Sequence, residues 1–286
     1  MTGKVTARIW RIEGAGGESL SDQVAVEEPL EIRLGWQGQD RVVAVTMRTP
    51  GNDAELAAGF LYAEGVVDWP ERIAGIHTVA PNIVQVELGD GPEPELAPLD
   101  RHFFATSACG VCGKAGLETL RLRVAAELPP RPVVSPEVLR ALPGRLRESQ
   151  GLFAATGGLH AAALFDAEGN LLGVREDVGR HNALDKLLGR AFLDSRLPLH
   201  DHLVMVSGRS SYEILQKCVA AGVPIVCAVS APSSLAVELA ERFGVTLIGF
   251  LRGDRFNVYS GIERLEIELP QSCADRRRER LLPITM

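Results

Sequence analysis

Residues 203–252 read LVMVSGRSSYEILQKCVAAGVPIVCAVSAPSSLAVELAERFGVTLIGFLR, and this stretch decides the fold class. Three short, nearly all-apolar runs, LVMVSG, VPIVCAVS and VTLIGFLR, predict buried strands. The helical patterns YEILQKCVAAG and SSLAVELAERFG separate them, and each is closed by a glycine. Continuous apolar strands that alternate with helices indicate a parallel sheet covered on both faces, so the sequence predicts an α/β fold.

Polar residues follow each of these three strands. They are Ser207, Gly208, Arg209, Ser210 and Ser211 after the first, Ser230, Ala231, Pro232, Ser233 and Ser234 after the second, and Arg252 and Arg255 after the third. In an open parallel sheet the carboxyl ends of the strands and the N–H groups of the following helices meet on one side. Taken alone, each serine-rich turn is most simply a helix cap. Three such turns on adjacent strands favour a site for a phosphate-bearing ligand.

The N-terminal half predicts a smaller α+β domain. Strands are expected in VAVEEPLEIRLG (24–35), RVVAVTMRT (41–49) and IVQVEL (83–88). An amphipathic helix is expected in 50–67, with Asn52 or Asp53 as its cap and Leu56, Phe60 and Leu61 at helical spacing. Prolines at 129, 130 and 132 indicate a linker, so we expect domains over 1–130 and 131–270 and a basic tail over 271–286. Ser135 and Pro136 are expected to open a helix that runs towards Gln150.

A polar block, EDVGRHNALDK, follows a predicted strand that His160 enters. On a helix beginning near Val178, His181 and Asp185 share one face, and Asn182 and Lys186 share another. For His181, ligand contact and helix packing are equal alternatives. Asp177 has the simpler interpretation of a helix cap.

Composition excludes several classes of protein. The 286 residues carry a formal net charge of −7, which argues against nucleic-acid binding because that needs a cationic surface. No apolar segment is long enough to span a membrane, and the first ten residues do not resemble a secretory signal. Five cysteines, an odd number, do not suggest a disulfide framework. The sequence therefore predicts a cytoplasmic protein.

Cys109 and Cys112 stand in TSACGVCGK, residues 106–114, a spacing that serves zinc sites, redox centres and sulfur relays alike. A structural zinc needs four ligands, and Cys218, Cys227 and Cys273 are isolated, so we expect no bound metal. A deaminase zinc site is also unsupported, because Ala162 stands where that signature requires Glu after His160. Lys114 favours the thiolate form, which indicates a nucleophilic thiol.

Several blocks together are similar to one known family. TGGLHAAAL, EDVGRHNALDK, SGRSSYEILQKCVAAGVPIVCAVSAPSSLA and TLIGFLRGDRFNVY, with MRTPGNDAELAAGFLYAEGVV and CGVCG upstream, closely resemble the formate dehydrogenase accessory sulfurtransferases, the FdhD family. The resemblance runs from about residue 24 to about residue 260. Each block is weak alone, but their number and order make the resemblance specific.

The resemblance implies a cytoplasmic sulfur carrier. Such a protein takes persulfide sulfur from a cysteine desulfurase and delivers it to the molybdenum cofactor, bis-molybdopterin guanine dinucleotide, which formate dehydrogenase needs. It also implies a homodimer and a three-layer, cytidine-deaminase-like second domain without deaminase activity.

The resemblance further assigns roles to residues. Cys109 is expected to carry the persulfide, with Cys112 assisting. The family's cofactor segment falls on Phe250, Leu251, Arg252, Gly253, Asp254 and Arg255. We add Ser207, Gly208, Arg209, Ser210, Ser230, Ala231, Pro232, Ser233, His160 and His181 as expected cofactor contacts. Two other functions compete with sulfur transfer: a noncatalytic chaperone for the cofactor and, ranked lower, a thiol-disulfide oxidoreductase.

Overall fold

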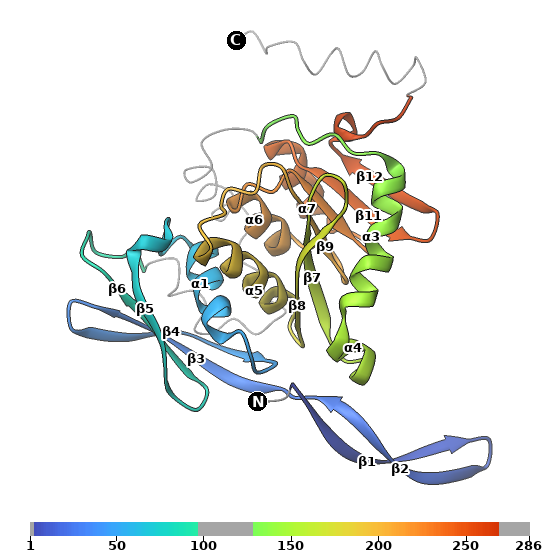
Figure 1. The fold of residues 1–286 in the computed structure, drawn as a ribbon, viewed down its shortest axis with the longest axis horizontal. Coiled ribbons are helices and arrows are strands. Elements are labelled where there is room, and N and C mark those ends of the chain that lie inside the picture. The colour runs from blue at the N-terminus through green and yellow to red at the C-terminus, as the bar shows by residue number, and fades with distance from the viewer. Residues whose placement is uncertain (1–2, 97–127, 269–286) are drawn as a thin grey trace.

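The computed structural model describes residues 3–96 and 128–268 of the chain (Figure 1). Within these residues the strands are β1 (Lys4–Glu13), β2 (Gly16–Ala25), β3 (Glu28–Trp36), β4 (Gln39–Arg48), β5 (Ile73–Ala80), β6 (Ile83–Leu88), β7 (His160–Phe165), β8 (Leu171–Asp177), β9 (Leu203–Val206), β10 (Ile225–Ala228), β11 (Thr246–Arg252) and β12 (Arg255–Ser260). The helices are α1 (Asp53–Glu64), α3 (Pro136–Ser149), α4 (Gly151–Thr156), α5 (Arg180–Leu193), α6 (Tyr212–Ala220) and α7 (Ser234–Phe243), with 3₁₀ turns η1 (Pro70–Arg72) and η3 (Ile262–Arg264).

The main sheet has the strand order β12-β11-β10-β9-β7-β8. β9, β10 and β11 are parallel, as predicted. The prediction of a parallel sheet is wrong for HAAALF, which is β7, because β7 runs antiparallel to β9. The strands β8 and β12, for which no prediction was made, run antiparallel to β7 and β11. Both outer strands belong to tight hairpins, and Gly169 and Gly253 supply the left-handed backbone (φ 76° and 60°) that their turns require.

Helices cover both faces of this sheet. Alternate residues of its strands point to opposite sides, so Ala161, Ala163 and Phe165 pack in one cluster with α3, whereas Ala162 and Leu164 belong to a second cluster with α5, α6 and α7. The α/β class and the covered sheet are confirmed. Likeness to a cytidine deaminase stays a prediction. Helix α3 begins as predicted, with the Ser135 side chain accepting a hydrogen bond from the backbone N–H of Val138 at 3.3 Å.

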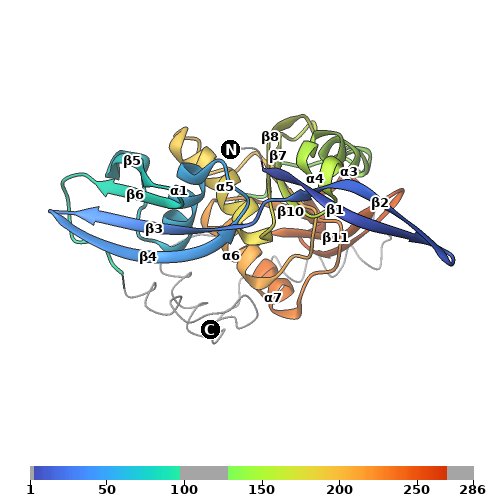
Figure 2. The same cartoon turned by 90° about the horizontal axis from the view of Figure 1, so that it is seen from below.

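A second sheet, with the order β4-β3-β6-β5, lies in the N-terminal half and contains the three strands expected there. The β1–β2 hairpin was not predicted. It projects away from the rest of the described chain (Figures 1 and 2), and most of its side chains are exposed. Because neither of its faces is buried, its sequence lacks the apolar alternation that reveals a half-buried strand.

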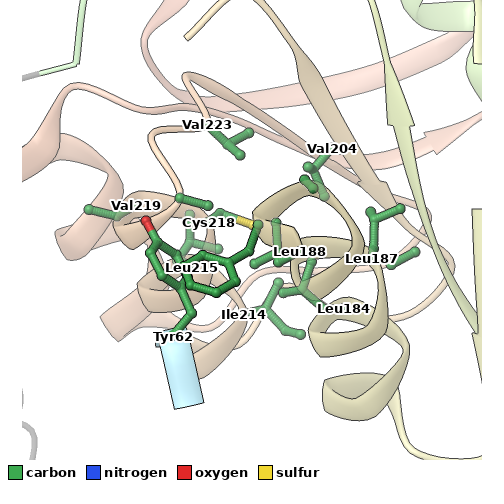
Figure 3. Close-up of a cluster of buried hydrophobic side chains, with 14 of the residues drawn as sticks. Tyr62, Leu184, Leu187, Leu188, Val204, Ile214, Leu215, Cys218, Val219 and Val223 are labelled. Carbon is green, nitrogen blue, oxygen red and sulfur yellow. The ribbon is translucent and has the colours of Figure 1, made fainter. Parts of the chain in front are cut away.

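Helix α1 corrects the prediction of an amphipathic helix. Its buried residues are Leu56, Ala57, Ala58, Gly59, Leu61, Tyr62 and Ala63, which point in nearly all directions around the axis. They are covered because α1 lies between the N-terminal sheet and the helices α5 and α6. In Figure 3, Tyr62 of α1 lies among side chains of α5 and α6, with the sulfur of Cys218 inside the same cluster.

The crossing of α1 and α5 is closer than ordinary helix packing allows. A Cβ atom built on Gly59 would overlap the carbonyl oxygen of Asp185, and one built on Gly189 would overlap the carbonyl oxygen of Glu55. Both obstacles are backbone atoms, which cannot rotate aside as a side chain can. Glycine is therefore required on each helix for the N-terminal and C-terminal halves to pack together.

Gly59→Ala should lower the free energy of unfolding by about 2–4 kcal/mol, because an added methyl group forces two packed backbones apart. Gly144→Ala is the matched control: Gly144 lies in α3, and no atom stands within 4 Å of its added Cβ. That control should be neutral or more stable by up to about 1 kcal/mol, because alanine favours a helix. Urea denaturation followed by circular dichroism measures both changes, and equal midpoints for the two variants would contradict this account of the crossing.

Candidate functional site

The three turns after β9, β10 and β11 lie side by side. The N–H of Ser230 donates a hydrogen bond to the carbonyl of Gly208 at 3.3 Å, and the N–H of Ser233 donates to the carbonyl of Ser210 at 3.0 Å. The N–H of Phe250 in turn donates to the carbonyl of Ser230 at 3.1 Å. The backbone thus joins the three polar segments into one edge, above which Arg209 and Ser233 are exposed.

The third turn is a bulge in β11. Pairing with β12 shifts register between Gly249 and Arg252, and Phe250 has a left-handed backbone with φ 52°. A non-glycine residue in that region is strained, and such strain is concentrated at functional positions. Gly249 permits the bulge to pack on the second turn, because its added Cβ would lie 3.0 Å from Pro232.

The side chains of this third turn have different surroundings. Residues 252–255, which are Arg252, Gly253, Asp254 and Arg255, are exposed, and Phe250 is half-buried. The Arg252 guanidinium lies 6.0 Å from the centre of the Phe250 ring. Leu251 is fully buried in the core beside α3, so only its backbone is available to a ligand.

His160, the first residue of β7, reaches the same edge. A Cβ built on Gly208 would lie 3.4 Å from its Nδ1, so the imidazole lies directly beside the first turn. Burial lowers the pKa of His160, and the nearby Arg180 acts in the same direction, against the smaller opposing effect of Asp177. The imidazole is therefore neutral near pH 7, with one ring nitrogen able to accept a hydrogen bond.

His181 and Asp185 share a face of α5, as predicted, and that face is turned to α6. His181 Nε2 lies 2.7 Å from Glu213 Oε2, and hydrogen bonding to His181 lowers the pKa of Glu213. One turn further, Lys217 Nζ donates to both carboxylate oxygens of Asp185, at 2.8 and 3.0 Å. Burial alone would lower the pKa of Lys217, but Asp185 and Glu64 outweigh it and hold that pKa above its ordinary value.

Asn182 and Lys186 occupy another face of α5, also as predicted, and bind the end of β4. Asn182 Nδ2 donates to the carbonyl of Met47 at 2.7 Å, and Lys186 Nζ donates to the carbonyl of Thr49 at 2.8 Å. Lys186 Nζ also lies 2.6 Å from Asp177 Oδ2, in a pair that is almost fully buried. Asn182 and Lys186 thus tie the two halves of the chain together.

Two acidic residues of the polar block are structural as well. Asp177 was interpreted as a helix cap, but the N-cap of α5 is Gly179, whose N–H donates to Asp177 Oδ1 at 2.8 Å. The physical reason is its ion pair with Lys186, which holds the carboxylate inside the protein instead of at the helix end. Glu176 accepts hydrogen bonds from the backbone N–H groups of Leu152 and Phe153, at 3.0 and 2.7 Å, and so satisfies the start of α4.

Some serine side chains of the turns accept hydrogen bonds from the backbone, and others have no partner. Ser233 caps α7, since its side chain accepts from the N–H of Ala236 at 3.3 Å, and Ser207 Oγ accepts from the N–H of Ala161 at 2.9 Å. Within the described part of the chain, the buried hydroxyls of Ser210 and Ser211 have no hydrogen-bond partner. Nε of Arg180 is also buried and unpaired there. Buried polar groups without partners are costly, so their presence at this edge favours a polar ligand.

Sequence reasoning missed Arg180 and Glu213 as members of this edge. Arg180 stands in the polar block that was singled out, but helical spacing alone does not show that it lies near His160. Glu213 is brought to His181 only by the packing of α6 on α5. No local signal in the sequence reports that contact.

Cys109 and Cys112 lie outside the described residues. Cys218 and Cys227 are fully buried, and burial raises the pKa of Cys218 to about 12 and that of Cys227 still further. Both are protonated thiols at neutral pH, without access to solvent, and are unsuited to act as nucleophiles. Among residues 3–96 and 128–268, no three His, Cys, Asp or Glu side chains gather as metal ligands. None of the helices described there is long and apolar enough to cross a membrane.

The chain is similar in sequence to proteins of one family. The FdhD/NarQ family model matches residues 25–266. A relative from Nocardia farcinica, named sulfur carrier protein FdhD, is 48% identical over 277 residues, which cover 93% of this chain and 96% of that protein. A relative of the same name from Sulfurisphaera tokodaii is 45% identical over 258 residues, covering 90% of this chain and 97% of that protein.

A solved structure has the same fold. The crystal structure of a candidate formate dehydrogenase accessory protein from Desulfotalea psychrophila superposes with a TM-score of 0.73 at 26% identity. The match covers 92% of this chain and all of that one. The similarity therefore extends over the main sheet, α1 and the strand ends together.

Proposed function

Because the chain belongs to the FdhD/NarQ family, we propose that it is a sulfur carrier serving formate dehydrogenase, with Cys109 as the residue that holds the sulfur. The observation that carries this proposal is similarity to proteins named sulfur carriers over about nine-tenths of the chain, joined to a CxxC pair in the sequence. Burial of Cys218 and Cys227 supports it, because it leaves the sulfur chemistry to the other cysteines.

Sulfur loading needs only thiol chemistry. The Cys109 thiolate attacks the outer sulfur of a donor persulfide, which we propose belongs to a cysteine desulfurase, and the S–S bond of the donor breaks. The donor leaves as a thiolate, and Cys109 becomes a persulfide. When the Cys112 thiolate then attacks the inner sulfur of Cys109, a Cys109–Cys112 disulfide forms and hydrosulfide leaves for the acceptor. A dithiol reductant restores both thiols before the next cycle.

The acceptor that we propose is the molybdenum cofactor, bis-molybdopterin guanine dinucleotide, bound as cargo at the strand ends. Arg209, Arg252 and Arg255 are exposed there and can each donate two parallel hydrogen bonds to a phosphate. The hydroxyls of Ser210 and Ser211 in the first turn are buried and lack a hydrogen-bond partner among the described residues. The exposed arginines support local capture of a strongly anionic ligand by a chain whose net charge is −7.

Neutral His160 has a distinct place in this proposal. A protonated imidazole would simply add one more positive charge beside Arg180. The neutral ring instead accepts a hydrogen bond from cargo N–H or O–H groups, so it can discriminate the orientation of the cargo. His181 has a supporting role, because Glu213 holds its ring between the first turns of α5 and α6.

A noncatalytic chaperone for the cofactor is the second candidate function. The same exposed arginines favour it, since binding of the cargo alone would use all of them. It differs from the carrier in needing no persulfide.

We also propose that the protein is cytoplasmic, that its second domain is cytidine-deaminase-like, and that it forms a homodimer.

Incubation with a cysteine desulfurase and labelled cysteine should add about 32 Da to the peptide that contains Cys109, as persulfide exchange requires. Intact mass and peptide mapping would locate the added sulfur. Cys109→Ala should abolish the gain, whereas the control Cys218→Ala should keep it, because that thiol is buried and protonated. Loading that persists in Cys109→Ala, or label on Cys218, would contradict the assignment.

GDP serves as a probe for the guanine nucleotide ends of the cargo. Arg252→Ala should raise the dissociation constant for GDP roughly ten- to hundredfold, because a charge-assisted hydrogen bond to phosphate is lost. Arg190→Ala is the control, since Arg190 lies in the last turn of α5, at the opposite end from His181. Isothermal titration calorimetry would compare the two variants, and equal affinities would place the nucleotide elsewhere.

A further inference from the structure

Helices α5 and α6 begin at the same edge of the molecule and run in the same direction. Figure 3 shows side chains of the two helices packed against each other. His181 in the first turn of α5 lies 2.7 Å from Glu213 in the first turn of α6, and one turn further Lys217 binds Asp185. Because the contacts match turn for turn, both helices have their N-termini beside the turn 207–211 that follows β9.

Glu213 places a negative charge at this edge. Its side chain is 40% exposed. Hydrogen bonding to His181 lowers the pKa of Glu213, against the opposing effect of burial, so the carboxylate is ionised at neutral pH. The exposed Arg209 stands four residues earlier, in the turn that is expected to meet phosphate. A carboxylate repels phosphate, so its presence here is favourable only if it contacts a different part of the ligand.

An acidic residue in the first turn of a helix also stabilises that helix, because the N-terminus carries a partial positive charge. This effect accounts for an acidic residue in α6, but it does not require an imidazole to fix the carboxylate. His181 is the hydrogen-bond partner of Glu213 among the described residues, and it lies against one oxygen, Oε2. The other oxygen is left able to accept hydrogen bonds from a ligand.

Arg180, the first residue of α5, is close to the same carboxylate. Its positive charge lowers the pKa of both His160 and Glu213. Nε of Arg180 and the hydroxyl of Tyr212 are buried and have no hydrogen-bond partner within the described residues. No ion pair joins Arg180 to Glu213 in that part of the chain, so each keeps hydrogen-bonding capacity for a third group. Buried polar atoms without partners are costly, which favours a ligand with polar atoms at this position.

An ionised carboxylate and a nearby guanidinium together match one nucleobase. Guanine presents two adjacent donors, N1–H and its 2-amino group, and a carboxylate can accept from both. It also presents two adjacent acceptors, O6 and N7, to which an arginine donates two parallel hydrogen bonds. Adenine has an amino group in place of O6 and no hydrogen on N1. It would therefore direct a donor at Arg180 and an acceptor at Glu213, and both contacts would be unfavourable.

We propose that Glu213 is the residue that selects a guanine ring, with Arg180 at the O6 and N7 edge of that ring. The diphosphate then lies on the exposed arginines of the turns. This inference rests on the proposed function, because the guanine ring belongs to the cargo proposed there. Removal of the Glu213 charge should change which base is bound, and not only how tightly the nucleotide is held.

Isothermal titration calorimetry of the full chain with GDP, IDP and ADP tests this selection. IDP lacks the 2-amino group, so the parent chain should bind GDP roughly tenfold more tightly than IDP, and roughly a hundredfold more tightly than ADP. In Glu213→Gln the difference between GDP and IDP should fall below roughly threefold, because a hydrogen bond to a charged acceptor is lost. Glutamine has the size of glutamate and keeps an oxygen that can accept from His181.

Glu241→Gln is the matched control. Glu241 is exposed in α7, and this change removes the same charge from the chain. It should leave the order of the three affinities as in the parent. Circular dichroism checks that both variants are folded.

Xanthosine diphosphate supplies a test by reversal, since it carries a carbonyl oxygen in place of the 2-amino group. It should bind Glu213→Gln roughly tenfold more tightly than the parent, because the glutamine amide can donate to that oxygen. A role limited to holding His181 would instead weaken all four nucleotides alike. If the parent binds GDP and Glu213→Gln keeps the same base preference, the inference is overturned and the proposed cargo binding stands. A parent chain that binds no GDP would overturn both.

Discussion

The close crossing of α1 and α5 is the constraint on which the rest of the structure depends. Gly59 and Gly189 allow the two backbones to touch, and this contact joins the N-terminal sheet to the layer that covers the main sheet. The neighbouring faces of α5 are polar and bind other elements of the chain. One binds the end of β4 through Asn182 and Lys186, and the other binds α6 through His181 and Asp185. A single helix thereby sets the positions of the N-terminal sheet and of the strand-end turns.

Some polar side chains of this region are paired inside the fold, and others at the strand ends are not. Asp177, Asp185 and Lys186 of the EDVGRHNALDK block are satisfied by one another, by Lys217 of α6 and by the backbone, which is the condition under which buried charge is tolerated. At the strand ends, by contrast, arginines are exposed and hydroxyls are unpaired within the described residues. The chain is acidic as a whole, so this concentration of donors at one edge supports the proposal that an anionic cargo binds there.

Much of the fold follows from patterns in the sequence, and the failures have physical causes. The buried strands β9, β10 and β11 are continuous apolar runs, and their topology alone predicts that the polar turns meet. The β1–β2 hairpin has no buried face and leaves no such pattern. Helix α1 shows helical spacing, but its burial on most sides depends on partners distant in sequence. The roles of Asp177 and Glu213 likewise depend on contacts that no local spacing encodes.

The central claim is that sulfur held on Cys109 passes to the cofactor of formate dehydrogenase, and a single-turnover chase tests it most directly. The chain is loaded with ³⁵S, separated from the desulfurase, and mixed with formate dehydrogenase whose cofactor lacks the activating sulfur. Label should leave the chain and be recovered with the extracted cofactor, in an amount that rises in step with enzyme activity. Activation of the enzyme while the label stays on the chain, or equal activation by Cys109→Ala, would contradict it and favour the chaperone.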